Sequence, residues 1–189
     1  MDPTPLSPRD FCSPAILLSG PVDHEMYRDF RRQLDAAAER DLVVVELTTL
    51  GGDPEVARMM GEDIRFGTDV APGRRFVFLG KAAIYSAGTT FMSFFSRPNR
   101  YLTRGTRLMI HERKLAKTVQ LNGPLTTCIA SVKATLHEIE SSIEIQNEGF
   151  ANLVRGSRVT LDEVLRRAPE NWYIEAGQAQ ELGLIEGVV

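Results

Sequence analysis

The sequence predicts an α/β fold built on a largely parallel sheet. Leu42–Leu47 is a nearly continuous β-branched run, which is typical of a strand covered on both faces. Met26, Phe30 and Leu34 recur at helical spacing just before it, which indicates an amphipathic helix. Since such strands and helices alternate through the first half of the chain, right-handed crossovers between parallel strands are expected.

The individual elements follow from composition and capping signals. Met1–Pro14 is rich in proline and polar residues, which indicates an irregular tail. Asp53 is a suitable helix cap and Pro54 suits the first helical position. The expected elements are a strand at 15–20, a helix at 24–40, a strand at 42–47, a helix from 54, a strand at 76–79, a helix from about 86, and one or two strands within 101–110.

The second half of the chain begins with a much longer helix. Apolar residues at helical spacing run from about 124 to 155, and Pro124 precedes the first of them. A helix of that length spans roughly 45 Å, more than the width of a small domain, so it is expected to project and pack against a partner chain. A short helix capped by Thr160 with Glu163, a helix ending at Gly183 and a strand at 184–189 complete a single domain spanning 15–189.

Composition excludes several function classes. A net charge of −3 gives no basic face for nucleic acid or an anionic membrane. Cys12 and Cys128 match no metal-ligand spacing, and no metal or other cofactor is expected. No stretch approaches the ~20 apolar residues needed to span a bilayer, and the amino terminus lacks a basic region followed by an apolar one. The expected location is therefore cytoplasmic.

Ser86 and His111 are the candidate catalytic residues. Each lies where a hydrophobic strand gives way to a turn or helix, the usual place for chemistry in an α/β protein. A serine hydroxyl is a weak nucleophile until a base accepts its proton. The chain has only three histidines, and His24 and His137 lie among charged residues on expected helices. Taken singly, a serine that caps a helix and a structural histidine are the more common explanations.

Two segments could supply main-chain amides to an anion. Gly51-Gly52 joins a strand to a helix, and glycine lets a reacting group approach the main chain closely. Ala87 follows Ser86 at an expected helix start, where amides lack intrahelical partners. No Lys-Ser/Thr pair follows the glycines, so nucleotide binding is unsupported. Gly52 and Ala87 are therefore candidates for an oxyanion hole, with an ordinary tight turn as the alternative.

The order of these parts resembles the Clp peptidase family of serine proteases, whose fold is crotonase-like. The resemblance runs from about residue 15 to 189 and includes the long helix, which corresponds to the family's handle. That helix would project from stacked parallel sheets covered by helices. The matching segments are Leu17–Val22, Thr49–Gly52, Ile84–Thr89, Arg107–His111 and Glu175–Glu186.

The resemblance implies roles for individual residues. Ser86 would be the nucleophile, His111 the general base, and the amides of Gly52 and Ala87 the oxyanion hole. An ungapped comparison puts Arg167 at the family's catalytic aspartate, and Arg167 cannot orient a histidine. Glu170 is the nearest substitute acid, and Glu163 is a weaker candidate because its capping role explains it.

The resemblance also implies partners. Substrates would be peptides or unfolded proteins, and copies would assemble into rings through the handle. The family's amino-terminal hairpin, which faces an ATPase unfoldase, is not recognisable in Met1–Pro14, so an ATPase partner stays open.

Three other functions stay open as well. The chain could be a non-catalytic Clp-like assembly or binding subunit, or a crotonase-type acyl-CoA enzyme. It could also be a Ser/Lys hydrolase, in which Lys114, Lys117 or Lys133 would serve as the base.

Overall fold

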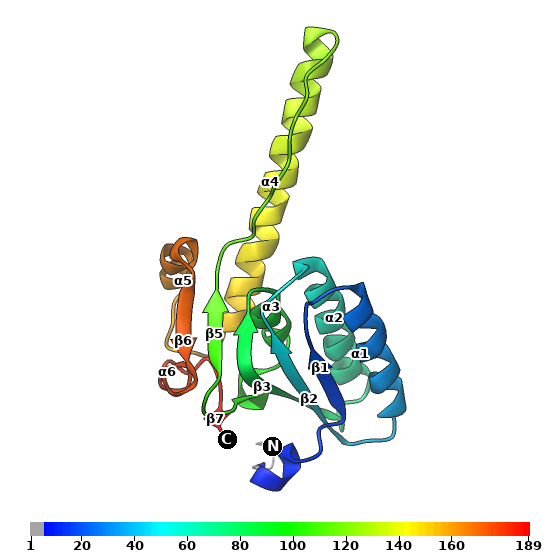
Figure 1. Cartoon of the computed structure of the whole chain (residues 1–189), viewed down its shortest axis with the longest axis vertical. Helices are drawn as coiled ribbons and strands as arrows, with labels where there is room; N and C mark the ends of the chain where they lie inside the picture. Colours follow the sequence, from blue (N-terminus) through cyan, green and yellow to red (C-terminus); the bar gives the residue numbers. More distant parts are fainter. Residues whose placement is uncertain (1–5) are drawn as a thin grey trace.

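Within residues 6–189, seven strands form one sheet whose hydrogen-bonded order is β1-β2-β3-β4-β7; β5 pairs with β3, and β6 pairs with β5 (Figure 1). The structure is a computed structural model that describes residues 6–189. Every pairing is parallel except that of β6 with β5. The strands are β1 Ile16–Ser19, β2 Leu42–Thr49, β3 Arg75–Tyr85, β4 Arg100–Leu102, β5 Arg107–Ile110, β6 Trp172–Glu175 and β7 Gly187–Val188.

Helices cover the sheet in the expected alternation. Asp53 accepts a hydrogen bond from the Glu55 amide at the start of α2, with Pro54 at the first helical position, as the sequence predicts. α1 ends at Ala36, four residues before the expected end at Arg40. The helices are α1 His24–Ala36, α2 Pro54–Val70, α3 Ala87–Met92, α4 Leu125–Val154, α5 Leu161–Arg167 and α6 Ala176–Glu181, with 3-10 turns η1 Pro8–Phe11, η2 Arg97–Asn99 and η3 Ala168–Glu170.

β3 is longer than the expected strand at 76–79, and its two halves pair with different strands. Phe78–Gly80 pairs with β4, whereas Ala83–Tyr85 pairs with β5. Ala82, between these segments, has φ of +56°, which breaks the regular extended geometry. The stacked arrangement therefore arises from one branching sheet, and the branch delivers Tyr85 to the turn that holds Ser86.

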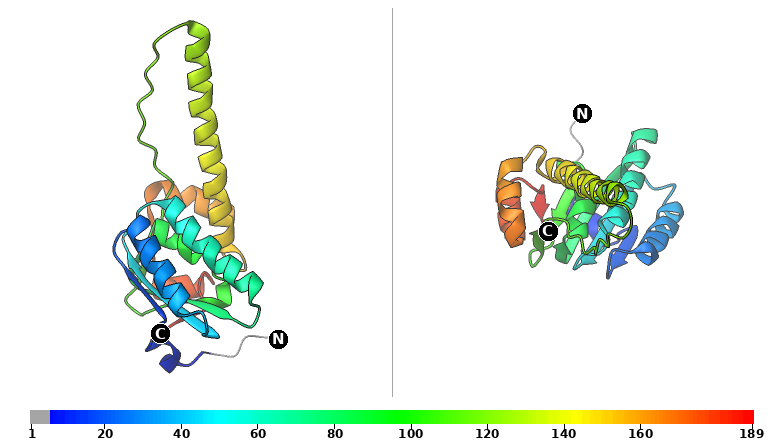
Figure 2. Two further views of the ribbon diagram at one scale, coloured as in Figure 1. Left: turned by 90° about the vertical axis from the view of Figure 1, so that its right-hand side faces the viewer. Right: turned by 90° about the horizontal axis from the view of Figure 1, so that it is seen from above.

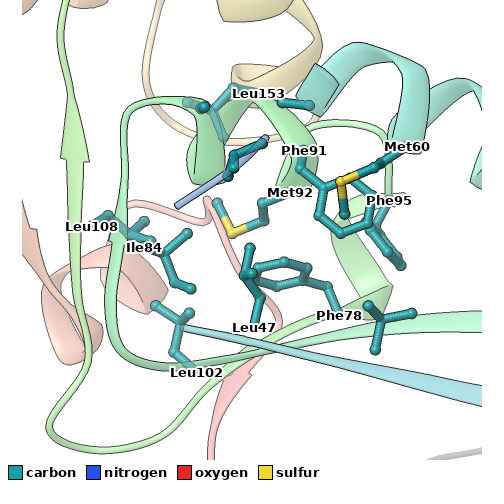
Figure 3. Packing of buried hydrophobic residues seen from close by; sticks show 14 of the residues in the cluster. Leu47, Met60, Phe78, Ile84, Phe91, Met92, Phe95, Leu102, Leu108 and Leu153 are labelled. Carbon is teal, nitrogen blue, oxygen red and sulfur yellow. The ribbon is translucent and has the colours of Figure 1, made fainter. Parts of the chain in front are cut away.

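The main core lies between the sheet and α1, α2 and α3. Phe78, Phe91 and Phe95 meet edge to face with centroid separations of 5.3–6.2 Å, and all are buried. Figure 3 shows Met60 and Leu47 packed around the same rings. This packing fixes α3 against the sheet, and with it the residue that precedes α3.

The segment before β1 is more ordered than the irregular tail that composition suggests. Pro8–Phe11 forms η1, where the side chain of Asp10 accepts a hydrogen bond from the Ser7 amide. Phe11 is buried, and its ring centroid lies 4.9 Å from that of Tyr101. The expectation of irregular structure was therefore wrong from Pro8 to Phe11, because an apolar anchor holds this turn. The part of the predicted tail at 1–5 lies outside the described residues.

α4 projects from the rest of the molecule as a handle, and the segment 112–124 runs beside it to its tip (Figures 1 and 2). An ion pair between Lys117 and Glu138 joins the two. One face of the helix is apolar and exposed, and its residues are Leu125, Ile129, Val132, Leu136, Ile139 and Ile143. Among residues 6–189, no helix is long and apolar enough to cross a membrane.

Arg100 fixes the base of the handle. Its guanidinium is buried and donates hydrogen bonds to carbonyl oxygens near the ends of α3 and α4 and before β7, namely those of Ser93, Phe95, Asn152, Leu153 and Leu184. Burial lowers the pKa of Arg100 to about 10, so the side chain stays charged at neutral pH. A buried cation satisfied by carbonyls thus joins the handle to the helix behind the candidate nucleophile.

Candidate active site

Ser86 occupies a sharp turn between β3 and α3. Its φ of +54° and ψ of −113° are unfavourable for a residue with a Cβ atom, and such strain persists only where the surroundings impose it. The Ser86 amide donates to the Met109 carbonyl at 2.9 Å, which ties the turn to β5. The Ser86 carbonyl accepts from the Thr89 amide and the Thr89 hydroxyl. These bonds hold the hydroxyl of Ser86 outward from a rigid main chain.

His111 follows directly after β5, and its imidazole meets the serine. The distance between His111 Nε2 and Ser86 Oγ is 2.6 Å. Burial lowers the pKa of His111 from its ordinary value, and the positive charge of Lys114 lowers it further, while the main chain of Glu112 partly opposes both. The imidazole is therefore neutral at pH 7, the state in which it can accept a proton from the serine.

Close approach of the main chain explains the glycine pair, since Gly51 lies against Ser86 and Gly52 lies against Val22. A Cβ atom on Gly51 would lie 3.0 Å from Ser86 Cβ, and one on Gly52 would lie 2.3 Å from the Val22 carbonyl oxygen. Both glycines also have positive φ, +116° and +150°. No other residue type fits this turn without displacing its neighbours, so the sequence requirement for two glycines follows from the close approach.

Gly52 and Ala87 border the same cleft as Ser86 and His111. The cleft has a volume of about 420 Å³, and its far wall is the foot of the handle, including Ile143 and Phe150. Ala87 is the first residue of α3, so its amide has no acceptor within the helix. A carbonyl group placed over Ser86 would therefore meet a nucleophile, a base and main-chain donors in an enclosed, partly apolar space.

The third member of a triad is not where the sequence suggests. His111 Nδ1 is buried and has no hydrogen-bond partner among residues 6–189, so Glu170 does not accept its proton. Glu170 lies in η3, before the strand that pairs with β5. The side chain of Arg167 lies over the Trp172 ring at 4.6 Å and pairs with Glu163 at 3.0 Å. Neither Glu170 nor Glu163, the two acids that the sequence suggests, therefore accepts a hydrogen bond from Nδ1 of His111.

The strand pairing brings the segment before β6 to the end of β5. The antiparallel ladder ends at the pair of Ile110 with Trp172, and continuing its register by one position would place Asn171 opposite His111. Asn171 itself lies outside the strand, with φ of +58° and an exposed side chain. Sequence reasoning missed Asn171 because it missed β6. The alternation of buried Trp172 and Ile174 with exposed residues was the available signal.

Between residues 6 and 189, no group of three His, Cys, Asp or Glu side chains is arranged to hold a metal ion. The Ser86 hydroxyl is bonded to His111 and, among residues 6–189, to none of Lys114, Lys117 and Lys133. The arrangement thus provides for acyl transfer through a serine activated by a histidine.

Comparisons with known proteins show what the chain and its fold resemble. No family model matches the sequence. The chain is 22% identical over 176 residues to the ATP-dependent Clp protease proteolytic subunit 2 of Pseudomonas aeruginosa. The aligned segment covers 92% of this chain and 80% of that protein. Its structure is similar to that of a ClpP1 mutant from Listeria monocytogenes, with a TM-score of 0.70 and 16% sequence identity over 92% of this chain and 90% of the other.

Proposed function

We propose that this chain, a Clp peptidase-like protein with the ClpP/crotonase-like fold, is a serine peptidase that works through an acyl-enzyme intermediate. The observation that carries the proposal is the 2.6 Å separation between His111 Nε2 and Ser86 Oγ beside a cleft. The strained turn at Ser86 and the close glycine turn support it, since each keeps the main chain open to a substrate carbonyl.

The reaction follows from the positions of these groups. Ser86 Oγ attacks the carbonyl carbon of a peptide bond while His111 Nε2 accepts the hydroxyl proton. The amides of Gly52 and Ala87 stabilise the oxyanion, and each such donor is typically worth ~10²–10³ in rate. His111 then donates the proton to the leaving amine, which leaves an acyl group on Ser86. Water, deprotonated by the same imidazole, releases the carboxylic acid and restores the serine.

Asn171 is the residue we propose for the third position. Nδ1 of His111 has no partner among residues 6–189, so this role requires the exposed Asn171 side chain to turn inward; its oxygen would then accept from Nδ1–H and select the tautomer that leaves Nε2 free. An amide carries no negative charge, so it stabilises the imidazolium less than a carboxylate would. We therefore expect slow hydrolysis, limited by the missing charge.

Substrate and assembly complete the proposal. The handle provides the apolar part of the cleft wall, which suits extended peptides with an apolar side chain near the cleaved bond. The exposed stripe on α4 suits packing against a second copy of the chain. The name of the Pseudomonas relative associates that protein with ATP-dependent proteolysis, and docking of an ATPase on this chain stays an open part of the proposal.

A fluorophosphonate probe tests the proposal, because it labels serines activated as nucleophiles. We expect labelling of the wild type at pH 8 and none of Ser86→Ala or His111→Ala. Ser93→Ala is the matched control, since Ser93 is a nearby buried serine whose hydroxyl donates to the Thr90 carbonyl. Peptide hydrolysis should fall by ~10⁴ or more in both site variants. A wild type that resists the probe at high concentration would remove the peptidase proposal.

One observation favours a second function. The buried Nδ1 atom of His111 has no hydrogen-bond partner in the described part of the chain, as in a site that has lost its acid. On that reading, the protein is a non-catalytic Clp-like subunit that binds or assembles. Ser86→Ala would then leave every phenotype of the protein unchanged, whereas polar substitutions on the handle would disturb assembly.

A further inference from the structure

Arg113 lies two residues after His111 and reaches across the active site. Its Nη1 atom lies 2.5 Å from Glu55 Oε1, in a pair that joins positions 58 residues apart. Glu55 is in the first turn of α2, three residues after Gly52. The pair therefore spans the two segments that carry the base and one of the oxyanion amides.

The main chain of Arg113 is held by the handle as well. Its amide donates to Gln146 Oε1 at 2.6 Å, and Gln146 is a buried side chain of α4. The segment after β5 is thus fixed from two sides, by α2 through a side chain and by α4 through the backbone. Both Arg113 and Gln146 border the catalytic cleft.

The ion pair is partly buried on its arginine side. The side chain of Arg113 is 19% exposed and that of Glu55 is 51% exposed, and Glu55 also accepts from Arg58 at 2.7 Å. Burial raises the pKa of Glu55, but the hydrogen bonds from Arg113 and Arg58 outweigh it, so the pKa is lowered overall. The carboxylate is therefore charged at neutral pH and holds both guanidinium groups.

We infer that Arg113 is a positioning residue, which sets the distance between His111 and the glycine turn by pairing with Glu55. The inference rests on the proposed peptidase function. A misplacement of about 1 Å between reacting groups can cost ~10²-fold in rate, whereas a partly exposed ion pair contributes little to stability. The expected signature of Arg113 is thus a large effect on turnover with a small effect on folding.

The test uses variants of the full chain with a fluorogenic peptide substrate. We expect Arg113→Met and Glu55→Gln each to lower kcat by ~10- to 10²-fold with KM within about twofold and an unchanged urea midpoint. The double variant should be no worse than either single one, because both break one contact. Arg113→Lys should restore part of kcat. Arg58→Met is the control, because it removes the other partner of Glu55 and leaves the pair with Arg113 intact.

In the kinetic experiment, the inference would be overturned by additive losses in the double variant, by a change in KM alone, or by a loss of rate that tracks a loss of stability. Imidazole NMR of the three histidines separates this outcome from failure of the peptidase proposal. In Arg113→Met, the His111 resonances should shift while those of His24 and His137 stay fixed. If the wild type proves inactive and Arg113→Met still shifts the His111 resonances, the positioning role is supported and the peptidase proposal is rejected. Unmoved His111 resonances would reject the positioning role whatever the activity.

Discussion

Large apolar side chains are mostly buried in the body of the molecule and mostly exposed on the handle. In the body, Phe30 and Ile84 are fully buried among neighbours from several elements. On the handle, Leu125 is 82% exposed and Ile129 56% exposed. The body therefore completes its core from its own chain, whereas the apolar stripe of the handle needs another surface to exclude water.

The catalytic groups follow this division. The candidate catalytic groups all lie just after strands of the body's sheet, in turns or at the start of α3, whereas the handle contributes wall residues to the cleft; these groups are Ser86, His111, Gly52 and Ala87. Arg100 and Gln146 connect the two regions. Substitutions can therefore separate what the body does alone from what depends on the handle.

The largest effect on folding is expected at Arg100. Arg100→Met removes the buried donor that bonds to five main-chain carbonyls. We expect a loss of about 3–5 kcal/mol in the free energy of unfolding, measured by urea denaturation. Arg104→Met, at an exposed arginine nearby, is the control and should change little. A loss below about 1 kcal/mol would mean that the handle is attached to the body by other contacts.

A polar handle should affect association and spare folding. The combined variant Ile129→Gln, Val132→Gln and Leu136→Gln removes apolar surface that is about half exposed in the single chain. Burying these three side chains against a partner is worth roughly 3 kcal/mol per copy, so the oligomer should dissociate at micromolar concentration. Light scattering after size exclusion measures this, with Lys133→Gln as control. A wild type that is already monomeric would contradict the assumed role of the stripe.

A negative charge at position 171 should raise the rate of peptide hydrolysis. In Asn171→Asp, a carboxylate opposite His111 can accept from Nδ1–H and stabilise the imidazolium that forms during attack. We expect peptide hydrolysis to rise by about tenfold or more, below the ~10⁴ that a triad acid can contribute. Glu170→Gln should have no effect, because Glu170 does not contact Nδ1. A loss of activity in Asn171→Asp would show that this side chain does not face the imidazole.

The sequence could predict the strands and helices whose pattern is set by local burial, including the capped start of α2 and the long apolar repeat of α4. It could also single out Ser86 and His111, because each follows a buried strand in an α/β order. It could not suggest Asn171, since that residue precedes a four-residue strand, β6, whose pairing with β5 joins positions 62 residues apart. The same holds for Arg113 and Glu55, whose contact is set by tertiary packing.

The smallest expected effect concerns the pH dependence of peptide hydrolysis. It arises from the charge of Lys114, which lies on the segment that leads from the body into the handle. Burial lowers the pKa of His111, and Lys114 lowers it further. Since the base must be neutral, kcat/KM should rise with pH through a value below the ordinary histidine range. Lys114→Gln removes a positive charge, which makes protonation easier, raises the pKa of His111 and moves the acid limb to higher pH. Because Lys114 is exposed, the loss at pH 5.5 should be less than about tenfold. Lys117→Gln, whose lysine pairs with Glu138, should leave the profile in place. An acid limb that stays fixed in Lys114→Gln would mean that burial alone sets the pKa of His111.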